Sequence, residues 1–339
     1  MKKSFAMPWA VLAMVVLLLA GCSKDDGTVA LEDQPPVGVT NELEAIKYFA
    51  ASDEFVQNVE ETFADKDMEP MDYGSFGKIA ADIIPVRFGR FINSVTRTIT
   101  VTVEPGDTIA IAHVEKEIDG IFKILAKYDL NDTVFVLIEK PFTDKATRNI
   151  IFKRVDRNPR IYWRNWLPVA TSLVEGGTAP QPVGDEINLT MIQMFLPNGD
   201  TITVTDPNSY YLRYRWVRHL SGGPNGGPPF DGGHRDVPEV NGGDQVILQA
   251  TLVSASPDTD LVALRYGFGR DHRRRMGMEL ISETDNGDGT FTRVFQIAYL
   301  VHFHTGFFHA GVDAITKATL FDDVAPYSVS WWGVPYRVF

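Results

Sequence analysis

The strongest constraint on the fold is a strict two-residue alternation along residues 93–103. Val95, Ile99, Val101 and Val103 share one set of alternate positions, whereas Ser94 and four threonines take the other. Successive side chains of a β-strand point to opposite faces, so this alternation predicts a half-buried antiparallel strand. A Pro-Gly-Asp turn at 105–107 follows, and alternating segments continue to residue 174. The sequence therefore predicts a meander of strands over this part of the chain.

Two helical segments precede these strands. Asn41, with Glu44 three positions later, is a capping-box-like start, and Ser52 offers a second N-terminal cap. Helices followed by a long curved antiparallel sheet resemble the NTF2-like (cystatin-like cone) fold, over residues 42–175. The segments that carry this resemblance are the helix pair, residues 88–90, the strand pair 94–103 and 108–118, and the closing strands with residues 152–154 and 166–169.

The resemblance implies an α+β domain at 41–175 with a pocket in its cone. His113 and Glu115 share one register of the predicted strand at 109–118, so both could line that pocket. A buried acid there would have a perturbed pKa and could act as a base. The alternative is that both side chains lie on the solvated face. The chain carries no GxSxG, P-loop or dinucleotide motif, and we assign no catalytic residue.

A second domain is predicted after a segment rich in glycine and proline. Small turn-forming residues replace the alternation, which predicts a linker at 176–184. Short strand candidates separated by turns fill 185–339 and indicate an all-β sandwich. Residues 240–266 and the hairpin entry at 288–291 look similar to immunoglobulin-like or fibronectin-type-III-like modules. The predicted fold class is therefore α+β, an NTF2-like domain followed by an immunoglobulin-like sandwich.

The histidines of the second domain form a candidate metal site. His302 and His304 are two positions apart and would share one face of a strand. His309 follows a possible turn at Thr305-Gly306, so three imidazoles could converge on a zinc ion. The alternative is a strand with apolar residues whose histidines simply lie on the solvent-exposed face.

The N-terminal 26 residues resemble a bacterial lipoprotein signal. Lys2 and Lys3 precede an apolar run at 9–20, which is short for a membrane span. The run ends in a lipobox made of Leu19, Ala20, Gly21 and Cys22, the only cysteine of the chain. The resemblance implies a signal peptide at 1–21 and a lipid anchor on Cys22, with diacylglycerol and palmitate as the attached groups.

The residues after the anchor predict its destination. Ser23, Lys24, Asp25 and Asp26 look like the signal that sends some lipoproteins to the outer face of the outer membrane. The alternative is a solvated tether, and the composition of residues 22–40 does predict a flexible acidic tether. The net charge of −12 argues against a nucleic-acid partner, because phosphate binding needs a basic surface.

These observations favour a lipid-anchored envelope protein, facing the cell exterior, with a non-catalytic role in binding, adhesion or assembly. Its expected partners are the membrane, through the anchor, and an envelope protein or glycan. One alternative is an NTF2-like small-molecule-binding or hydrolytic enzyme that uses His113 and Glu115. A second alternative is a glycan- or metal-binding surface protein that uses the histidines of the second domain, with zinc as its cofactor.

Overall fold

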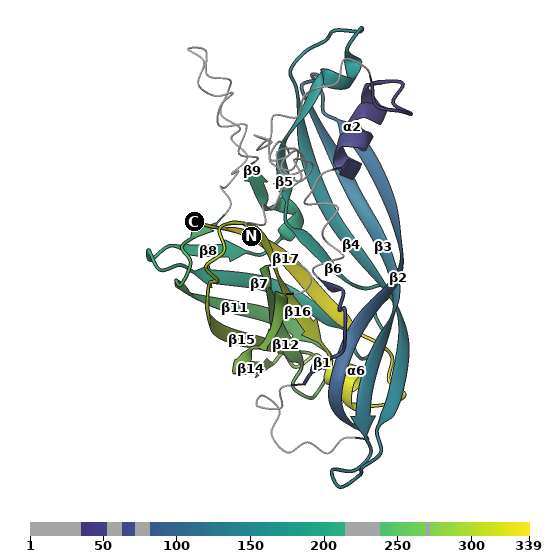
Figure 1. The fold of residues 1–339 in the computed structure, drawn as a ribbon, viewed down its shortest axis with the longest axis vertical. Helices are drawn as coiled ribbons and strands as arrows, with labels where there is room; N and C mark the ends of the chain where they lie inside the picture. Colours follow the sequence, from purple (N-terminus) through teal and green to yellow (C-terminus); the bar gives the residue numbers. More distant parts are fainter. Residues whose placement is uncertain (1–34, 53–62, 72–81, 214–237, 269–271) are drawn as a thin grey trace, which may run out of the picture. The chain divides into compact units, whose positions relative to one another are not determined.

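The computed structural model describes residues 35–52, 63–71, 82–213, 238–268 and 272–339 of the chain. The predicted signal peptide, the lipobox and residues 23–26 lie outside these residues. Residues Gly38–Phe339 form one unit, and two antiparallel sheets dominate its described part (Figure 1). None of the helices in the described ranges is long and apolar enough to cross a membrane.

The larger sheet has twelve strands, and its main path runs β1-β2-β3-β4-β6-β17-β16-β12-β13. Strands β5 and β9 extend it from β4, and β10 pairs in parallel with β17. The strands are β1 (Glu69–Pro70), β2 (Ile84–Val103), β3 (Ile109–Lys127), β4 (Val136–Arg154), β5 (Trp166–Ser172), β6 (Val174–Thr178), β9 (Tyr211–Arg213), β10 (Glu239–Val240), β12 (Leu261–Phe268), β13 (His272–Gly277), β16 (Gly306–Ile315) and β17 (Val329–Val338).

The smaller sheet has five strands in the order β14-β15-β11-β7-β8. They are β7 (Ile187–Phe195), β8 (Thr201–Val204), β11 (Gln245–Ser254), β14 (Glu279–Asp285) and β15 (Phe291–Leu300). The helical elements of the described residues are short: α2 (Glu42–Ser52), α6 (Lys317–Phe321) and the 3-10 turns η2 (Tyr162–Arg164) and η3 (Pro207–Ser209).

Strands β2, β3 and β4 are 19 or 20 residues long and lie side by side (Figure 1). The predicted alternation is real: Ile99 and Val101 pack with α2, while the threonines of β2 are exposed. Glycine often interrupts a strand, but β3 continues through Gly120. Any Cβ at Gly120 would overlap the Phe142 ring, so this glycine serves close packing and not a turn.

The predicted α+β fold class is wrong. In an NTF2-like cone the first 175 residues would close their own sheet over helices. In this structure β4 pairs with β6, and β6 pairs with β17 from the far end of the sequence. The described residues are therefore mostly β, and one curled antiparallel sheet runs through both halves of the chain.

The glycine-rich segment at 176–184 begins inside this sheet. Gly176 and Gly177 belong to β6, and Trp331 of β17 packs against Gly176 where a Cβ would stand. Trp331 is buried beside Phe63, whose ring centroid lies 4.0 Å away. The small residues that indicated a linker therefore let two strands and an indole ring approach closely.

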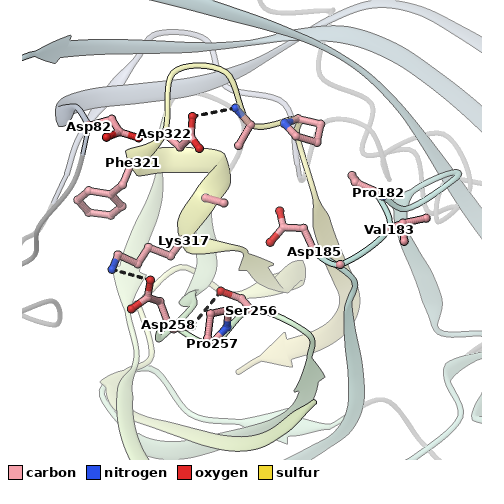
Figure 2. Close-up of a pocket in the computed structure, with 14 residues that line it drawn as sticks. Asp82, Pro182, Val183, Asp185, Ser256, Pro257, Asp258, Lys317, Phe321 and Asp322 are labelled. Carbon is pink, nitrogen blue, oxygen red and sulfur yellow. Dashed lines mark hydrogen bonds and ion pairs between the residues drawn. The ribbon is translucent and has the colours of Figure 1, made fainter. Parts of the chain in front are cut away.

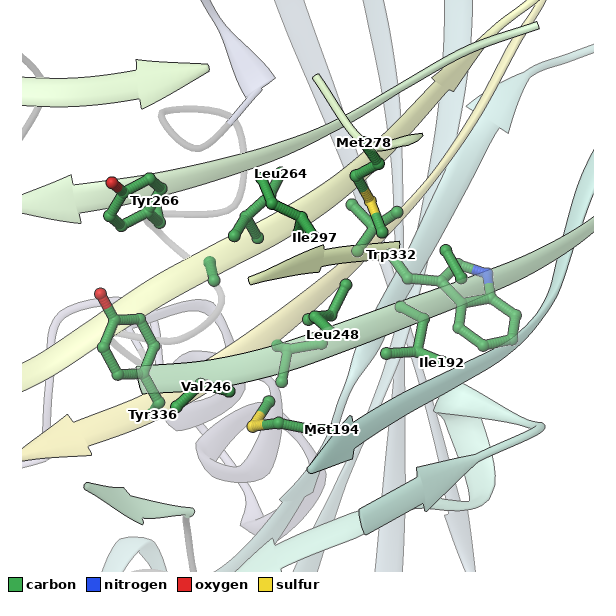
Figure 3. Packing of buried hydrophobic residues seen from close by; sticks show 14 of the residues in the cluster. Ile192, Met194, Val246, Leu248, Leu264, Tyr266, Met278, Ile297, Trp332 and Tyr336 are labelled. Carbon is green, nitrogen blue, oxygen red and sulfur yellow. The ribbon is translucent and has the colours of Figure 1, made fainter. Parts of the chain in front are cut away.

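Residues after 185 contribute the two facing layers of a β-sandwich. The smaller sheet supplies Ile192, Leu248 and Ile297, and the larger sheet supplies Leu264 and Trp332, to one continuous apolar core (Figure 3). Such alternate inward-facing residues are what sheet-on-sheet packing requires. This β-rich arrangement is compatible with a β-sandwich, but one layer is shared with the long strands, so the predicted separate immunoglobulin-like domain is wrong.

Candidate functional site: an acidic pocket beside helix α6

Helix α6 is held at both ends by side chains from other parts of the chain. Thr316 caps its N-terminus, and its hydroxyl donates to Asp185 Oδ2 at 2.7 Å. At the other end, Lys140 Nζ of β4 donates to the Asp322 carbonyl oxygen at 2.6 Å. A lysine at this position satisfies a terminal carbonyl and complements the helix dipole.

A cavity of about 610 Å³ lies beside this helix (Figure 2). Four segments that are distant in sequence enclose it: the segment before β2, the loop before β7, the loop between β11 and β12, and α6 with the turn after it. The lining residues are Asp82, Pro182, Val183, Gly184, Asp185, Ser256, Pro257, Asp258, Lys317, Ala318, Phe321, Asp322, Ala325 and Pro326. Its volume falls in the range of small-molecule sites in proteins.

Carboxylates dominate the charge of this pocket. Four aspartates line it, against a single lysine, Lys317, which forms an ion pair of 3.0 Å with Asp258. Asp322 holds its own loop, since its Oδ1 accepts hydrogen bonds from the main-chain nitrogens of Val324 and Ala325. In Figure 2 the Asp185 side chain projects from the loop before β7 toward α6. The lining therefore carries net negative charge.

Two titratable groups near α6 have displaced pKa values. Burial raises the pKa of Asp185 to about 6, although the Thr316 hydrogen bond and the charge of Lys140 oppose this. Glu186 and Asp322 add like charge and act in the same direction as burial. Burial also lowers the pKa of Lys140 to about 8, against the attraction of Asp322 and Asp185. A cation that entered the pocket would favour the ionised form of Asp185.

The serine hydroxyl groups near the pocket donate hydrogen bonds to main-chain carbonyl oxygens. Ser256 Oγ donates to the Asp258 carbonyl oxygen at 3.2 Å, and Ser328 Oγ donates to the Asp185 carbonyl oxygen at 2.6 Å. An activated nucleophile would instead contact a general base. The arrangement is suited to holding a positively charged group, because its carboxylates exceed its ammonium groups.

The candidate zinc ligands lie on two different elements of the structure. His302 and His304 lie in the loop after β15 and not in a strand, with ring centroids 5.9 Å apart. His302 Nε2 is 3.1 Å from Tyr336 Oη, and burial, together with His304, lowers the pKa of His302. His309 belongs to β16, where its backbone lies opposite Pro335. Among the side chains that the structure describes, no three His, Cys, Asp or Glu residues are grouped to hold a metal ion.

His113 and Glu115 lie on the outer face of β3. Buried residues alternate with them along this strand, which puts both on the solvent side. His113 Nδ1 is 2.8 Å from Asn149 Oδ1, and Glu115 forms an exposed ion pair with Lys145 at 3.4 Å. This placement agrees with the alternative of a solvated face.

Sequence reasoning missed the residues of the acidic pocket. Asp185 follows a glycine at the end of the predicted linker, Asp258 follows a proline, and Asp322 precedes another aspartate. Each has the pattern of a turn, and nothing along the sequence indicates that the three turns meet. No protein-family model, curated protein or solved structure matches this chain.

Proposed function

We propose that this chain is a lipid-anchored protein of the bacterial outer membrane, that it faces the cell exterior, and that it binds a ligand without catalysis. The anchor is supported by the lipobox at 19–22, which contains the only cysteine of the chain. Each buried acyl methylene contributes about 0.8 kcal/mol to membrane association, so two or more chains give a durable anchor. Residues 23–26 support export to the outer face.

The binding role is carried by one observation, the excess of carboxylates in the pocket beside α6. A small organic cation, such as a polyamine, or the basic side chain of an envelope protein matches this charge and volume. Asp185 is the central ligand group of the proposal. Its carboxylate is partly buried, where electrostatic attraction is stronger than in water, so a cation that approaches it is bound favourably. Asp258 and Lys317 form an ion pair in which Asp258 is exposed to solvent, and such pairs contribute little binding free energy.

The anchor is tested by expressing the full chain in a diderm bacterium. We expect the protein in the outer-membrane fraction, with mass spectrometry showing an acylated Cys22 at the new N-terminus. Cys22→Ala should keep its signal peptide and should be lost from the outer-membrane fraction. A variant with alanine at Lys24, Asp25 and Asp26 is the control for orientation. It should remain acylated but lose its accessibility to protease on intact cells. An unmodified thiol and an intact Met1 would refute the anchor.

The pocket is tested by calorimetric titration of the purified chain with spermidine. We expect Asp185→Asn to weaken binding about fivefold to tenfold, which corresponds to roughly 1–1.4 kcal/mol. Asp200→Asn is the matched control, because it removes the same charge from the exposed β7–β8 turn. Equal affinities of both variants and the parent chain would show that spermidine binds the acidic surface in general. In that case the pocket has no binding role.

A further inference from the structure

One long edge of the larger sheet is open in the part of the chain that the structure describes. Strand β2 pairs with β3 along its whole length. On its other side β1 reaches only Arg87 and Phe88. No described strand pairs with the second edge of β2 between Ser94 and Val103. These ten residues offer a row of backbone donors and acceptors to a further strand.

The other free edges carry features that discourage strand addition. Strand β14 has Glu279, Glu283 and Asp285 and a bulge at Ile281. Strand β13 carries three consecutive arginines, and β8 is only four residues long. Charges, bulges and short lengths are the usual protections of exposed edges.

Strand β2 has none of these protections between Ser94 and Val103. This stretch contains no proline, and its pairing with β3 runs there without a register shift. Its one charged side chain, Arg97, is turned to the helix, where Nη1 donates to the Ala51 carbonyl oxygen at 2.9 Å. Val95 and Val103 are each 37% exposed, so their aliphatic side chains are accessible to a partner. The edge is therefore long, regular and almost uncharged.

We propose that two copies of this chain pair edge to edge through Ser94–Val103 of β2, in antiparallel orientation about a two-fold axis. The pattern of this strand is complementary to itself. Antiparallel pairing of two identical strands sets threonine against threonine on one face and, on the other, the mainly aliphatic set that also contains Arg97 against its own copy. A C2 interface of this kind uses the same patch on both subunits.

The charge distribution favours a second copy over a charged partner at this edge. Each chain has a net charge of −12, so two copies repel each other at most places on their surfaces. The stretch from Ser94 to Val103 contains no acidic residue, and repulsion is smallest where such stretches meet. Pairing joins the two long meanders into one sheet in the order β4-β3-β2-β2-β3-β4.

The test uses the full chain in detergent, with single cysteines introduced at each position from 95 to 102. In a two-fold antiparallel pair, one residue lies on the axis opposite its own copy. We expect oxidation to crosslink chains strongly at that position, with a decline on both sides. Glu117→Cys is the matched control, because Glu117 pairs with Thr96 one strand inward. Its two copies would be about 14 Å apart, beyond disulfide reach. The parent chain controls for crosslinking through Cys22.

Light scattering after size exclusion gives a second, independent measurement. We expect a dimer whose dissociation constant rises at least tenfold in Thr98→Lys, because the lysines of both copies meet at the edge. Thr190→Lys adds the same charge on β7, which is not an edge strand, and should leave the dimer intact. A monomer at all concentrations overturns the proposal. So does a dimer that crosslinks equally at Glu117→Cys or that is unaffected by Thr98→Lys.

Discussion

Arg265 and Asp65 form an ion pair of 2.6 Å across 200 positions of sequence, and both side chains are at most 6% exposed. Arg275 reaches the same carboxylate at 2.8 Å, and the Arg90 main-chain nitrogen donates to it at 2.7 Å. Asp313 completes the cluster by accepting from Arg90 and Arg265. The cluster ties the segment before β2 to strands β12, β13 and β16.

Removing the carboxylate charge of Asp65 should strongly destabilise the protein. In Asp65→Asn, Arg265 would keep only Asp313 and Arg275 only the more distant Glu69 as counter-charges, and we expect a loss of about 3–5 kcal/mol. Denaturant unfolding measures this directly. Glu115→Gln is the control, since its ion pair with Lys145 is exposed and should contribute no more than about 1 kcal/mol. Similar losses in both variants would contradict a structural role for the buried cluster.

The pH dependence of stability should reflect Asp144. Burial raises the pKa of Asp144 to about 6, although Arg90 and the hydrogen bonds from Trp331 and Tyr327 oppose it. In the unfolded chain the pKa of an aspartate is about 3.9, so the folded state binds this proton more tightly. The free energy of unfolding should therefore rise as the pH falls from about 7 to about 4.

Asp144→Asn isolates this contribution. In the variant, the rise in the free energy of unfolding from about pH 7 to about pH 4 should be smaller by up to about 2–3 kcal/mol. Two pKa units correspond to this free energy. Asp185 and Asp260 also have raised pKa values, so part of the slope should persist in the variant. Denaturant curves at several pH values give the measurement, with Asp200→Asn as the control. An unchanged slope would show that Asp144 does not take up the proton.

Binding of a cation at the acidic pocket should weaken as the pH falls. Asp185 loses its charge as the pH passes through about 6, so affinity for spermidine should be lower at pH 5 than at pH 7.5. The Asp185→Asn variant should bind weakly at both pH values and show little dependence. Calorimetric titrations at the two pH values check this. A dependence that is the same with and without the Asp185 carboxylate would assign it to another group.

Gly176→Ala should destabilise the junction between β6 and β17. Its new Cβ would overlap the buried Trp331 ring, and overpacking of this kind costs about 1–3 kcal/mol. A smaller ring relieves the overlap, so Gly176→Ala combined with Trp331→Phe should show a favourable interaction in a double-mutant cycle. Additive losses would mean that the alanine is accommodated by a shift of the backbone.

Glu42 should control the attachment of helix α2. Its carboxylate accepts from Arg154, Asn165 and Trp166 at distances between 2.6 and 3.1 Å. Burial raises the pKa of Glu42, but these three partners outweigh it and lower the pKa overall. In Glu42→Gln we expect faster amide exchange along 42–52 with little change in the sandwich. Glu44→Gln, which removes an exposed pair with Lys47, should leave this exchange unchanged.

The sequence predicted the strands better than their pairing. Alternation identified much of β2 and β3, because side chains of a half-buried sheet must alternate. It could not show that β6 joins β17, since such pairing depends on contacts between residues about 150 positions apart. Glycines beside a buried indole ring also have the composition of a linker, and this misplaced the boundary between the two halves.

The candidate site was even less accessible to sequence reasoning. Asp185, Asp258 and Asp322 each follow or form a turn, where aspartate is common for local reasons. The histidines at 302 and 304 had the spacing of a strand, but the chain leaves β15 before them. A spacing rule holds only within an element, so a shift of a few residues in its end changes which side chains can meet.

The bond from the Val329 main-chain nitrogen to Thr178 Oγ1 spans 151 positions and has a consequence for synthesis. A ribosome adds roughly 5–20 residues each second, so β6 waits on the order of 10–30 s for its neighbour β17 to be made. During that interval Trp331 does not yet cover Gly176, and β6 lacks the strand that pairs with it. A chain interrupted before Val329 would stay in that unfinished state, which makes it a natural substrate for quality-control proteases.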